Sequence, residues 1–400
     1  MNLEFLRELI VPASTKIAMI VLDGLGGLPL TPDGKTELET ARTPNLDALA
    51  ARSALGLTVP LGPGITVESG PGHLALFGYD PLRYRIGRGV LEALGIEFDL
   101  QPNDVAARGN FCTMNDAGIV TDRRAGRIPT EASKDLARLL TMRIDDVEIF
   151  VEVVKEHRLA IVLRGAGLGA AVSGSDPLKN GAPPQPVRAL AADSDKTARV
   201  VNQFIERARQ LLADKSPANM LLVRGLDRYP NFPAFPKVFG LRAAAIAIAP
   251  TYRGIARLVG MHILPVNGST FADEFATLEQ HWNDFDFFYL HIKNTDLAGE
   301  DGDFARKVRV IEEVDALLPR LCALEPDVVI VGGDHSTPAV LRAHSWHPVP
   351  VLLYSPTVRA DGIAEFGERA CARGSLGVLP AQDLMPLALA HAQRIEKFSA

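Results

Sequence analysis

Three apolar runs in the chain each lead into an aspartate, and this repeated pattern predicts the centre of the fold. The run Val-Val-Ile-Val over residues 328–331 is β-branched throughout, which is typical of a strand buried in a parallel sheet. Because ligands bind at the carboxyl ends of strands in open α/β sheets, we expect the three carboxylates to meet there. The runs and their aspartates are 16–22 with Asp23, 287–293 with Asp296, and 328–331 with Asp334.

Apolar spacings of three and four predict helices, the clearest of which starts with Thr43 as its cap and Pro44 in its first turn. The predicted helices are 3–10, 44–52, 195–213, 253–259, 271–282 and 304–324, the further strands are 103–111, 157–164, 219–224, 241–249 and 348–354, and 299–303 is an acidic loop. Arginines gather in the middle third, whereas the candidate metal-binding carboxylates lie in the outer parts. We therefore predict that a substrate-binding domain, 96–235, is inserted into a metal-binding domain formed by 1–95 and 236–400.

Composition narrows the functional classes. A chain of 400 residues that is 47% hydrophobic favours two packed domains. A net charge of −6 does not support nucleic-acid binding, and the apolar runs are too short to span a membrane. The N-terminus carries charges where a secretory signal would be apolar, and the three scattered cysteines are typical of reduced thiols. We expect a cytoplasmic protein, whose oligomeric state the sequence does not predict.

The Asp334-His335 pair suggests a divalent metal, because a carboxylate beside an imidazole on a rigid strand suits Mn²⁺, Zn²⁺ or Mg²⁺. One such aspartate is more often a helix cap, but three of them with a histidine favour a metal site. His344 and His347 precede a core strand shortly downstream, and we expect at least one of them to be a ligand.

Two further motifs each have an ordinary and a chemical interpretation. Ser69 precedes a Gly-Pro-Gly turn and a helix over 73–77, so it is either a simple N-cap or a nucleophile activated by a nearby metal. The segment Asp122-Arg-Arg-Ala-Gly-Arg127 is either a solvated loop or an anion-binding cluster in which the aspartate orients an arginine.

Together these motifs resemble the cofactor-independent phosphoglycerate mutases, specifically their archaeal-type branch within the alkaline-phosphatase superfamily. The resemblance covers nearly the whole chain. The motifs that carry it are Asp23-Gly24, Ser69 to His73 followed by Leu-Phe-Gly-Tyr-Asp-Pro81, 122–127, Lys293 to Asp296, Gly332 to Thr337, and His344 with Pro-Val-Pro350. It implies an alkaline-phosphatase-like α/β fold, in which helices flank a mostly parallel sheet and a smaller α/β domain is inserted.

The resemblance also implies roles for individual residues. Two divalent metals are expected, Mn²⁺ first, with Zn²⁺, Mg²⁺ or Co²⁺ as alternatives, and no bisphosphoglycerate. One metal would be held by Asp23, Ser69, Asp334 and His335, and the other by Asp296, Glu300 and His344. The substrate, a small phosphorylated three-carbon acid, would contact His73, Asp122, Arg123, Arg124, Arg127 and Arg224.

Two positions depart from the family pattern. Glu300 stands where the family has a histidine ligand, so either Glu300 itself or His347 would complete that metal site. Arg253 lies near a position where relatives are expected to have lysine.

The implied activity is the interconversion of 3-phosphoglycerate and 2-phosphoglycerate in glycolysis and gluconeogenesis, through a phosphoserine at Ser69 and with closure of the inserted domain to exclude water. Two alternatives remain at this stage. One is a metal-dependent phosphatase or phosphopentomutase of the same superfamily, and the other is a weakly active metal-binding relative.

Overall fold

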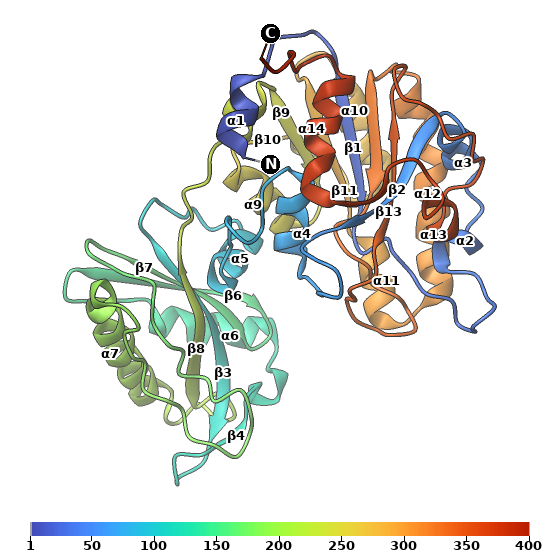
Figure 1. Ribbon diagram of the computed structural model, residues 1–400. Helices are drawn as coiled ribbons and strands as arrows, with labels where there is room; N and C mark the ends of the chain where they lie inside the picture. The colour runs from blue at the N-terminus through green and yellow to red at the C-terminus, as the bar shows by residue number, and fades with distance from the viewer. Residues whose placement is uncertain (1, 400) are drawn as a thin grey trace. The chain divides into compact units, whose positions relative to one another are not determined.

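The computed structural model describes residues 2–399, which form two compact units (Figure 1). Unit 1 comprises the chain up to Arg85 and from Phe232 onward, and unit 2 comprises Ile86–Asn231. Residues 86–95, which the sequence assigned to the outer domain, belong to unit 2, because helix α5 (Arg88–Gly95) packs there against strands β3 and β8. Gly89 allows this contact, since a Cβ at this position would lie 2.3 Å from the Ala106 carbonyl oxygen.

Unit 1 is built on an eight-stranded sheet that is mostly parallel, as the sequence predicts. In sheet order the strands are β10 (His262–Ile263), β9 (Ala243–Ala247), β11 (Phe287–Ile292), β1 (Ile17–Leu22), β12 (Val328–Gly332), β13 (Val349–Tyr354), β2 (Ser53–Val59) and β14 (Gly377–Pro380). Among these eight strands, only β13 runs against its neighbours, pairing antiparallel with both β12 and β2. Strands β11, β1 and β12 are buried along their whole length, which explains their continuous apolar sequences.

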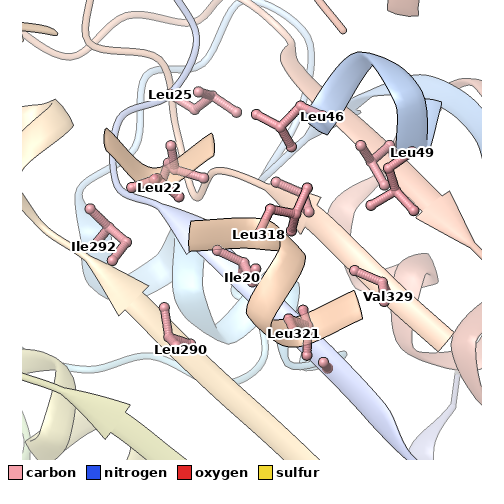
Figure 2. Close-up of a cluster of buried hydrophobic side chains, with 14 of the residues drawn as sticks. Ile20, Leu22, Leu25, Leu46, Leu49, Leu290, Ile292, Leu318, Leu321 and Val329 are labelled. Atoms are coloured by element: carbon pink, nitrogen blue, oxygen red, sulfur yellow. The ribbon is translucent and has the colours of Figure 1, made fainter. Parts of the chain in front are cut away.

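Helices cover the sheet of unit 1 (Figure 1). They are α1 (Leu3–Glu8), α2 (Glu37–Thr40), α3 (Pro44–Ala50), α4 (Ser69–Leu76), α8 (Phe235–Phe239), α9 (Pro250–Leu258), α10 (Phe271–Gln280), α11 (Asn294–Asp301), α12 (Phe304–Cys322), α13 (Glu368–Cys371) and α14 (Leu384–His391). Figure 2 shows the core between α12, α3 and the central strands, where Leu318 and Leu321 of α12 lie beside Ile20 and Val329. This packing fixes the strands whose ends carry the predicted ligands.

Three local expectations need correction. The acidic loop expected at 299–303 is helical up to Asp301, because α11 continues from Asn294 until Gly302 takes a left-handed conformation. Thr43 precedes α3 but makes no capping hydrogen bond to the backbone. Helix α4 already starts at Ser69 and includes the Gly-Pro-Gly segment that was expected to form a turn.

Unit 2 is an antiparallel sheet with helices. Its strands run in the order β4 (Val120–Asp122), β3 (Val105–Met114), β7 (Arg158–Arg164), β6 (Val147–Lys155) and β5 (Met142–Ile144), with β8 (Met220–Arg228) also paired to β3. Helices α6 (Thr130–Leu140) and α7 (Asp195–Leu212) pack on the face that carries Val105, Ala107 and Phe111. Within residues 2–399, no helix combines the length and the apolar character that crossing a membrane would need.

Candidate active site

The predicted metal-binding residues converge at one edge of the sheet in unit 1. Strands β11, β1 and β12 are neighbours and parallel, so Asp296, Asp23 and Asp334 leave them at the same edge. Strand β13 runs the opposite way, and the loop that leads into it therefore brings His344 to this edge as well. The sheet order explains why residues far apart in sequence share one site.

The first cluster contains Asp23, Asp334 and His335, all buried. His335 Nε2 lies 3.5 Å from Asp23 Oδ1 and 3.2 Å from Asp334 Oδ2. Ser69 Oγ lies 3.1 Å from the same nitrogen. Three of the four residues that the resemblance assigns to one metal thus have ligand atoms within 4.8 Å of one another, and the fourth, Ser69, contacts the histidine among them.

The second cluster contains Asp296, His335 and His344. His344 Nε2 is 3.4 Å from Asp296 Oδ1 and 3.9 Å from Glu300 Oε1. His347 instead bonds Ser345 Oγ through Nδ1 and stacks on Trp346. Of the two candidates for the missing family ligand, the geometry therefore favours Glu300.

Hydrogen-bond directions define the tautomer of His335. Thr337 Oγ1 donates to Asp296 Oδ1 at 2.6 Å, so it can only accept from His335 Nδ1–H, which lies 3.0 Å away. Burial lowers the pKa of His335, which favours the neutral ring. Its Nε2 therefore presents a lone pair to the carboxylates of Asp23 and Asp334, with no hydrogen between them.

The lone pairs of His335 Nε2 and of the Asp23 and Asp334 carboxylates point toward one another, an arrangement that a bound cation would stabilise. Burial and the neighbouring Asp334 raise the pKa of Asp23 to about 6. Asp334 Oδ2 has no hydrogen-bond partner among the described residues. The donor set of carboxylate oxygens and imidazole nitrogens fits divalent metals such as Mn²⁺ or Zn²⁺.

Ser69 is positioned by the first turn of α4. Gly72 lets this helix approach the loop after β12, because a Cβ at Gly72 would lie 2.4 Å from the Asp334 carbonyl oxygen. His73, expected to contact substrate, is instead fully buried, with Nδ1 2.8 Å from the Ser69 carbonyl oxygen and 3.1 Å from Asp334 Oδ2. His73 reaches the Ser69 carbonyl because it lies four positions, about one helical turn, after Ser69 in α4.

Four side chains at this site were not assigned from the sequence. Tyr252 Oη donates to Ser69 Oγ at 3.3 Å, and Lys293 Nζ donates to Tyr252 Oη at 2.7 Å and to Asp296 Oδ2 at 2.6 Å. His291 Nε2 lies 2.9 Å from Asp23 Oδ2, and Thr337 bonds Asp296. The available sequence signals were that His291 and Lys293 lie in the apolar run before Asp296, and that Lys293 and Thr337 lie within motifs that carry the family resemblance. Arg253 Nη1 donates to the carbonyl oxygens of Ala247 and Ile248.

The predicted arginine segment of unit 2 is organised differently from the expectation. Asp122 accepts from the backbone N–H groups of Arg124 and Gly126, so it shapes the turn and does not orient an arginine. Arg123 is held by Asp176, whose oxygens lie 2.8 Å from its Nε and 2.5 Å from its Nη2. Asp176 also lies 3.5 Å from Nε of Arg224. Arg124 and Arg127 are exposed.

Arg123 and Arg224 lie in a cationic face of unit 2 that also includes Arg108 and Arg158, and that the sequence did not reveal. Arg108 of β3 pairs in register with Arg224 of β8, and Asn110 pairs with Arg158 of β7. Burial and nearby arginines lower the pKa of Arg108 to about 10 despite Glu92. Arg108 Nε, Arg224 Nε and Asn110 Oδ1 have no hydrogen-bond partner within residues 2–399. The two guanidinium Nε–H groups are donors suited to binding an anion, whereas Asn110 Oδ1 is an acceptor.

Comparison with known proteins identifies similar sequences and structures. The family model of the 2,3-bisphosphoglycerate-independent phosphoglycerate mutases matches residues 50–219. Two relatives carry the name "Probable 2,3-bisphosphoglycerate-independent phosphoglycerate mutase". The one from Thermotoga sp. (strain RQ2) is 52% identical, with 99% of each chain covered. The one from Thermus thermophilus is 53% identical, covering 99% of this chain and 98% of the relative. A cofactor-independent phosphoglycerate mutase structure from Thermoplasma acidophilum has a TM-score of 0.77 at 32% identity and covers 94% of this chain and all of its own.

Proposed function

The chain belongs to the 2,3-bisphosphoglycerate-independent phosphoglycerate mutase family and interconverts 3-phosphoglycerate and 2-phosphoglycerate. From this premise we propose which of its residues catalyse the reaction and which bind the substrate. Ser69 is the nucleophile that takes the phosphoryl group and returns it to the other hydroxyl of the bound glycerate. The observation that carries this proposal is the placement of Ser69 Oγ 3.1 Å from His335 Nε2, beside the carboxylates of Asp23 and Asp334.

The buried carboxylates and histidines are the proposed metal ligands. Asp23, Ser69, Asp334 and His335 would hold one divalent ion, and Asp296, Glu300 and His344 the other. When bound, such ions neutralise charge that develops on the attacking and leaving oxygens of a phosphoryl transfer. Glu300 in place of a histidine favours harder ions, so Mn²⁺ is the proposed metal.

The protein's own groups hold the nucleophile. The neutral His335 ring accepts from the Ser69 hydroxyl, so the serine hydrogen points toward Nε2. The start of α4 places free backbone N–H groups near Ser69, where the helix dipole favours the negative charge of a phosphoryl group. Both effects would favour a phosphoserine at this position.

The cationic face of unit 2 is the proposed binding site for the substrate's carboxylate and phosphate. Arg123 and Arg224 are its central members, because Asp176 holds the Arg123 guanidinium by two hydrogen bonds and lies 3.5 Å from Nε of Arg224. The variants Arg123→Gln and Arg224→Gln should raise KM about tenfold or more, since charge-assisted hydrogen bonds contribute about 1.5–3 kcal/mol each. Arg164→Gln is the matched control, because Asp104 holds Arg164 in the same way on another part of unit 2. Equal KM values for all variants would exclude this binding site.

The central experiment measures mutase activity without added bisphosphoglycerate. Activity should disappear with EDTA and return with Mn²⁺, and acid quenching with ³²P-labelled substrate should trap a phosphoenzyme. Ser69→Ala should abolish both the activity and the labelled enzyme. Ser53→Ala is the control, because Ser53 is a buried serine of the same unit that donates to the Leu49 carbonyl of α3. A Ser69→Ala enzyme with full activity would refute the nucleophile assignment.

The metal assignment has its own test. Glu300→His should shift the metal that best restores activity from Mn²⁺ toward Zn²⁺, because imidazole is the softer ligand. Glu300→Gln should weaken Mn²⁺ binding, measured by calorimetric titration of the metal-free protein. An unchanged metal preference in both variants would exclude Glu300 as a ligand.

A further inference from the structure

Tyr252 is in direct contact with the proposed nucleophile. Its hydroxyl, from helix α9, donates to Ser69 Oγ at 3.3 Å, and its side chain is buried. Ser69 Oγ therefore lies between two groups of opposite hydrogen-bonding character. His335 Nε2 accepts on one side, and the Tyr252 phenol donates on the other. This arrangement gives Ser69 one fixed hydrogen direction.

Two neighbours hold the phenol in place. Lys293 Nζ donates to Tyr252 Oη at 2.7 Å, so the phenol oxygen accepts from the ammonium, and its single hydrogen remains for Ser69 Oγ or for the carboxylate of Asp23. A donor bound to the phenol oxygen also strengthens the phenol as a donor. The Tyr252 ring stacks on His291 with centroids 3.7 Å apart, which fixes the ring plane.

We propose that Tyr252 is a catalytic residue whose hydroxyl stabilises the charge on Ser69 Oγ during phosphoryl transfer, and that Lys293 is its positioning residue. This inference rests on the proposed phosphoserine at Ser69. It adds a donor that belongs to the protein itself and needs no metal to be present.

The contribution follows from the bonds that change. When the phosphoserine reacts, the Oγ–P bond breaks and Oγ keeps the electron pair, while a glycerate hydroxyl oxygen bonds to phosphorus. In the first transfer the Ser69 hydrogen passes to the glycerate oxygen that leaves phosphorus. In the second transfer the hydrogen of the attacking glycerate hydroxyl passes to Ser69 Oγ, so atoms and charge balance over the cycle. Tyr252 transfers no proton. Its hydrogen bond strengthens as charge builds on Oγ, which lowers the barrier without changing substrate binding.

The test compares two tyrosine-to-phenylalanine variants. Tyr252→Phe removes only the hydroxyl and keeps the ring stack on His291. Tyr289→Phe is the matched control, because Tyr289 lies in the same core, beside His73, and its hydroxyl has no hydrogen-bond partner within the described chain. Tyr252→Phe should lower kcat about 10- to 100-fold with KM within about twofold, as for loss of one transition-state donor. Tyr289→Phe should leave both constants unchanged.

Two readouts separate this role from a structural one. Thermal unfolding should show that Tyr252→Phe remains folded, and rapid acid quenching should show slower formation and slower breakdown of the phosphoenzyme. If Tyr252→Phe retains normal kcat while Ser69→Ala is inactive, the inference fails and the proposed nucleophile stands. If Ser69→Ala is active, the proposed function itself fails, and this inference with it.

Lys293 is tested by its dependence on Tyr252. If Lys293 acts through the phenol, Lys293→Met should lower kcat clearly in the wild-type background but much less in the Tyr252→Phe background. Because Lys293 also contacts Asp23 and Asp296, both measurements are made at saturating Mn²⁺. Equal effects in the two backgrounds would overturn the positioning role.

Discussion

Lys307 offers a sharp test of how the active-site loops are held together. This residue of α12 is fully buried, and its ammonium donates to the carbonyl oxygens of Gly24, Gly26 and Thr337 at 2.8, 3.0 and 2.8 Å. Gly24 and Gly26 follow Asp23, and Thr337 follows the Asp334-His335 pair. One cation therefore joins the two loops that carry the first cluster. We predict that Lys307→Met weakens both stability and catalysis.

The magnitude comes from opposing terms. Each hydrogen bond from a charged donor contributes about 1.5–3 kcal/mol, so three of them contribute roughly 5–9 kcal/mol. Replacing the ammonium by an apolar side chain also removes a desolvation penalty of several kcal/mol. Two losses outweigh this gain in stability. Three buried carbonyls lose their hydrogen-bond donor, and the carboxylates of Glu37 and Glu368 lose the positive charge of the lysine that their own charges favour. The net loss should be about 3–5 kcal/mol, which matches the cost of breaking a buried ionic network.

Lys16 provides the matched control. Its ammonium donates to the carbonyls of Trp282 and Phe285 at 2.7 and 2.8 Å, at the amino end of β1 and away from the metal-type clusters. It is only half-buried and has two acceptors, so Lys16→Met should cost about 1–2 kcal/mol. With about 2–4 °C per kcal/mol for a unit of this size, the Tm should fall by roughly 10 °C for Lys307→Met and roughly 4 °C for Lys16→Met.

The assay combines unfolding and turnover. Tm is measured by circular dichroism, and mutase activity is measured at a temperature at which both variants are folded. Lys307→Met should lose most of its activity under these conditions, whereas Lys16→Met should keep the wild-type rate. A Lys307→Met protein that is no less stable than Lys16→Met, or that turns over normally, would refute the idea that this cation aligns the two loops.

Three further predictions address other parts of the molecule. Burial raises the pKa of Glu274 to about 8, from the ordinary glutamate value of 4.5. Between these two pH values the unfolded chain releases the Glu274 proton and the folded chain keeps it, so the wild-type protein loses stability as pH rises from 4.5 to 8. Glu274→Gln should therefore gain about 3 kcal/mol relative to wild type between pH 5 and pH 8, measured by denaturant unfolding, and a constant difference would contradict it. Gly24→Ala should lower activity more than tenfold, because Gly24 has φ +64° and a Cβ there would lie 2.4 Å from Thr337 Oγ1. Gly118→Ala is the control: Gly118 has φ +76° but open space around it, so the substitution should cost only backbone strain of about 1 kcal/mol. Asp176→Asn should raise KM for phosphoglycerate severalfold in steady-state assays, because Arg123 loses its orienting charge, and Asp104→Asn should not.

The strands that carry the site were predictable because buried parallel strands have continuous apolar sequences. This signal identified β1, β11 and β12 and the aspartate after each of them. It did not identify β2, whose sequence Ser-Ala-Leu-Gly-Leu-Thr-Val follows α3 after only a short turn. Nor did it show that β13 is antiparallel, since direction depends on the path of the connecting loop and not on strand composition.

Side chains that meet only through tertiary structure could not be predicted in the same way. Tyr252 reaches Ser69 because α9 follows β9, two strands from β1 in the sheet. Asp176 holds Arg123 across a loop, and Arg108 meets Arg224 only through the register of β3 and β8. The burial of His73, which was expected to contact substrate, could likewise not be predicted. The turn of the helix instead directs its ring back toward the Ser69 carbonyl.

The hydrogen-bond directions form one consistent chain through the site. Lys293 donates to Tyr252, Tyr252 donates to Ser69, and Ser69 donates to His335. His335 then donates to Thr337, which donates to Asp296. Each hydroxyl in this chain has one donor and one acceptor role, and reversing any link would leave two hydrogens or two lone pairs facing each other. A cation at His335 Nε2 would take the lone pair to which Ser69 donates, and the serine hydrogen would then be free to leave. Under the proposed role of Ser69 as nucleophile, Tyr252 is then the donor that remains on its Oγ.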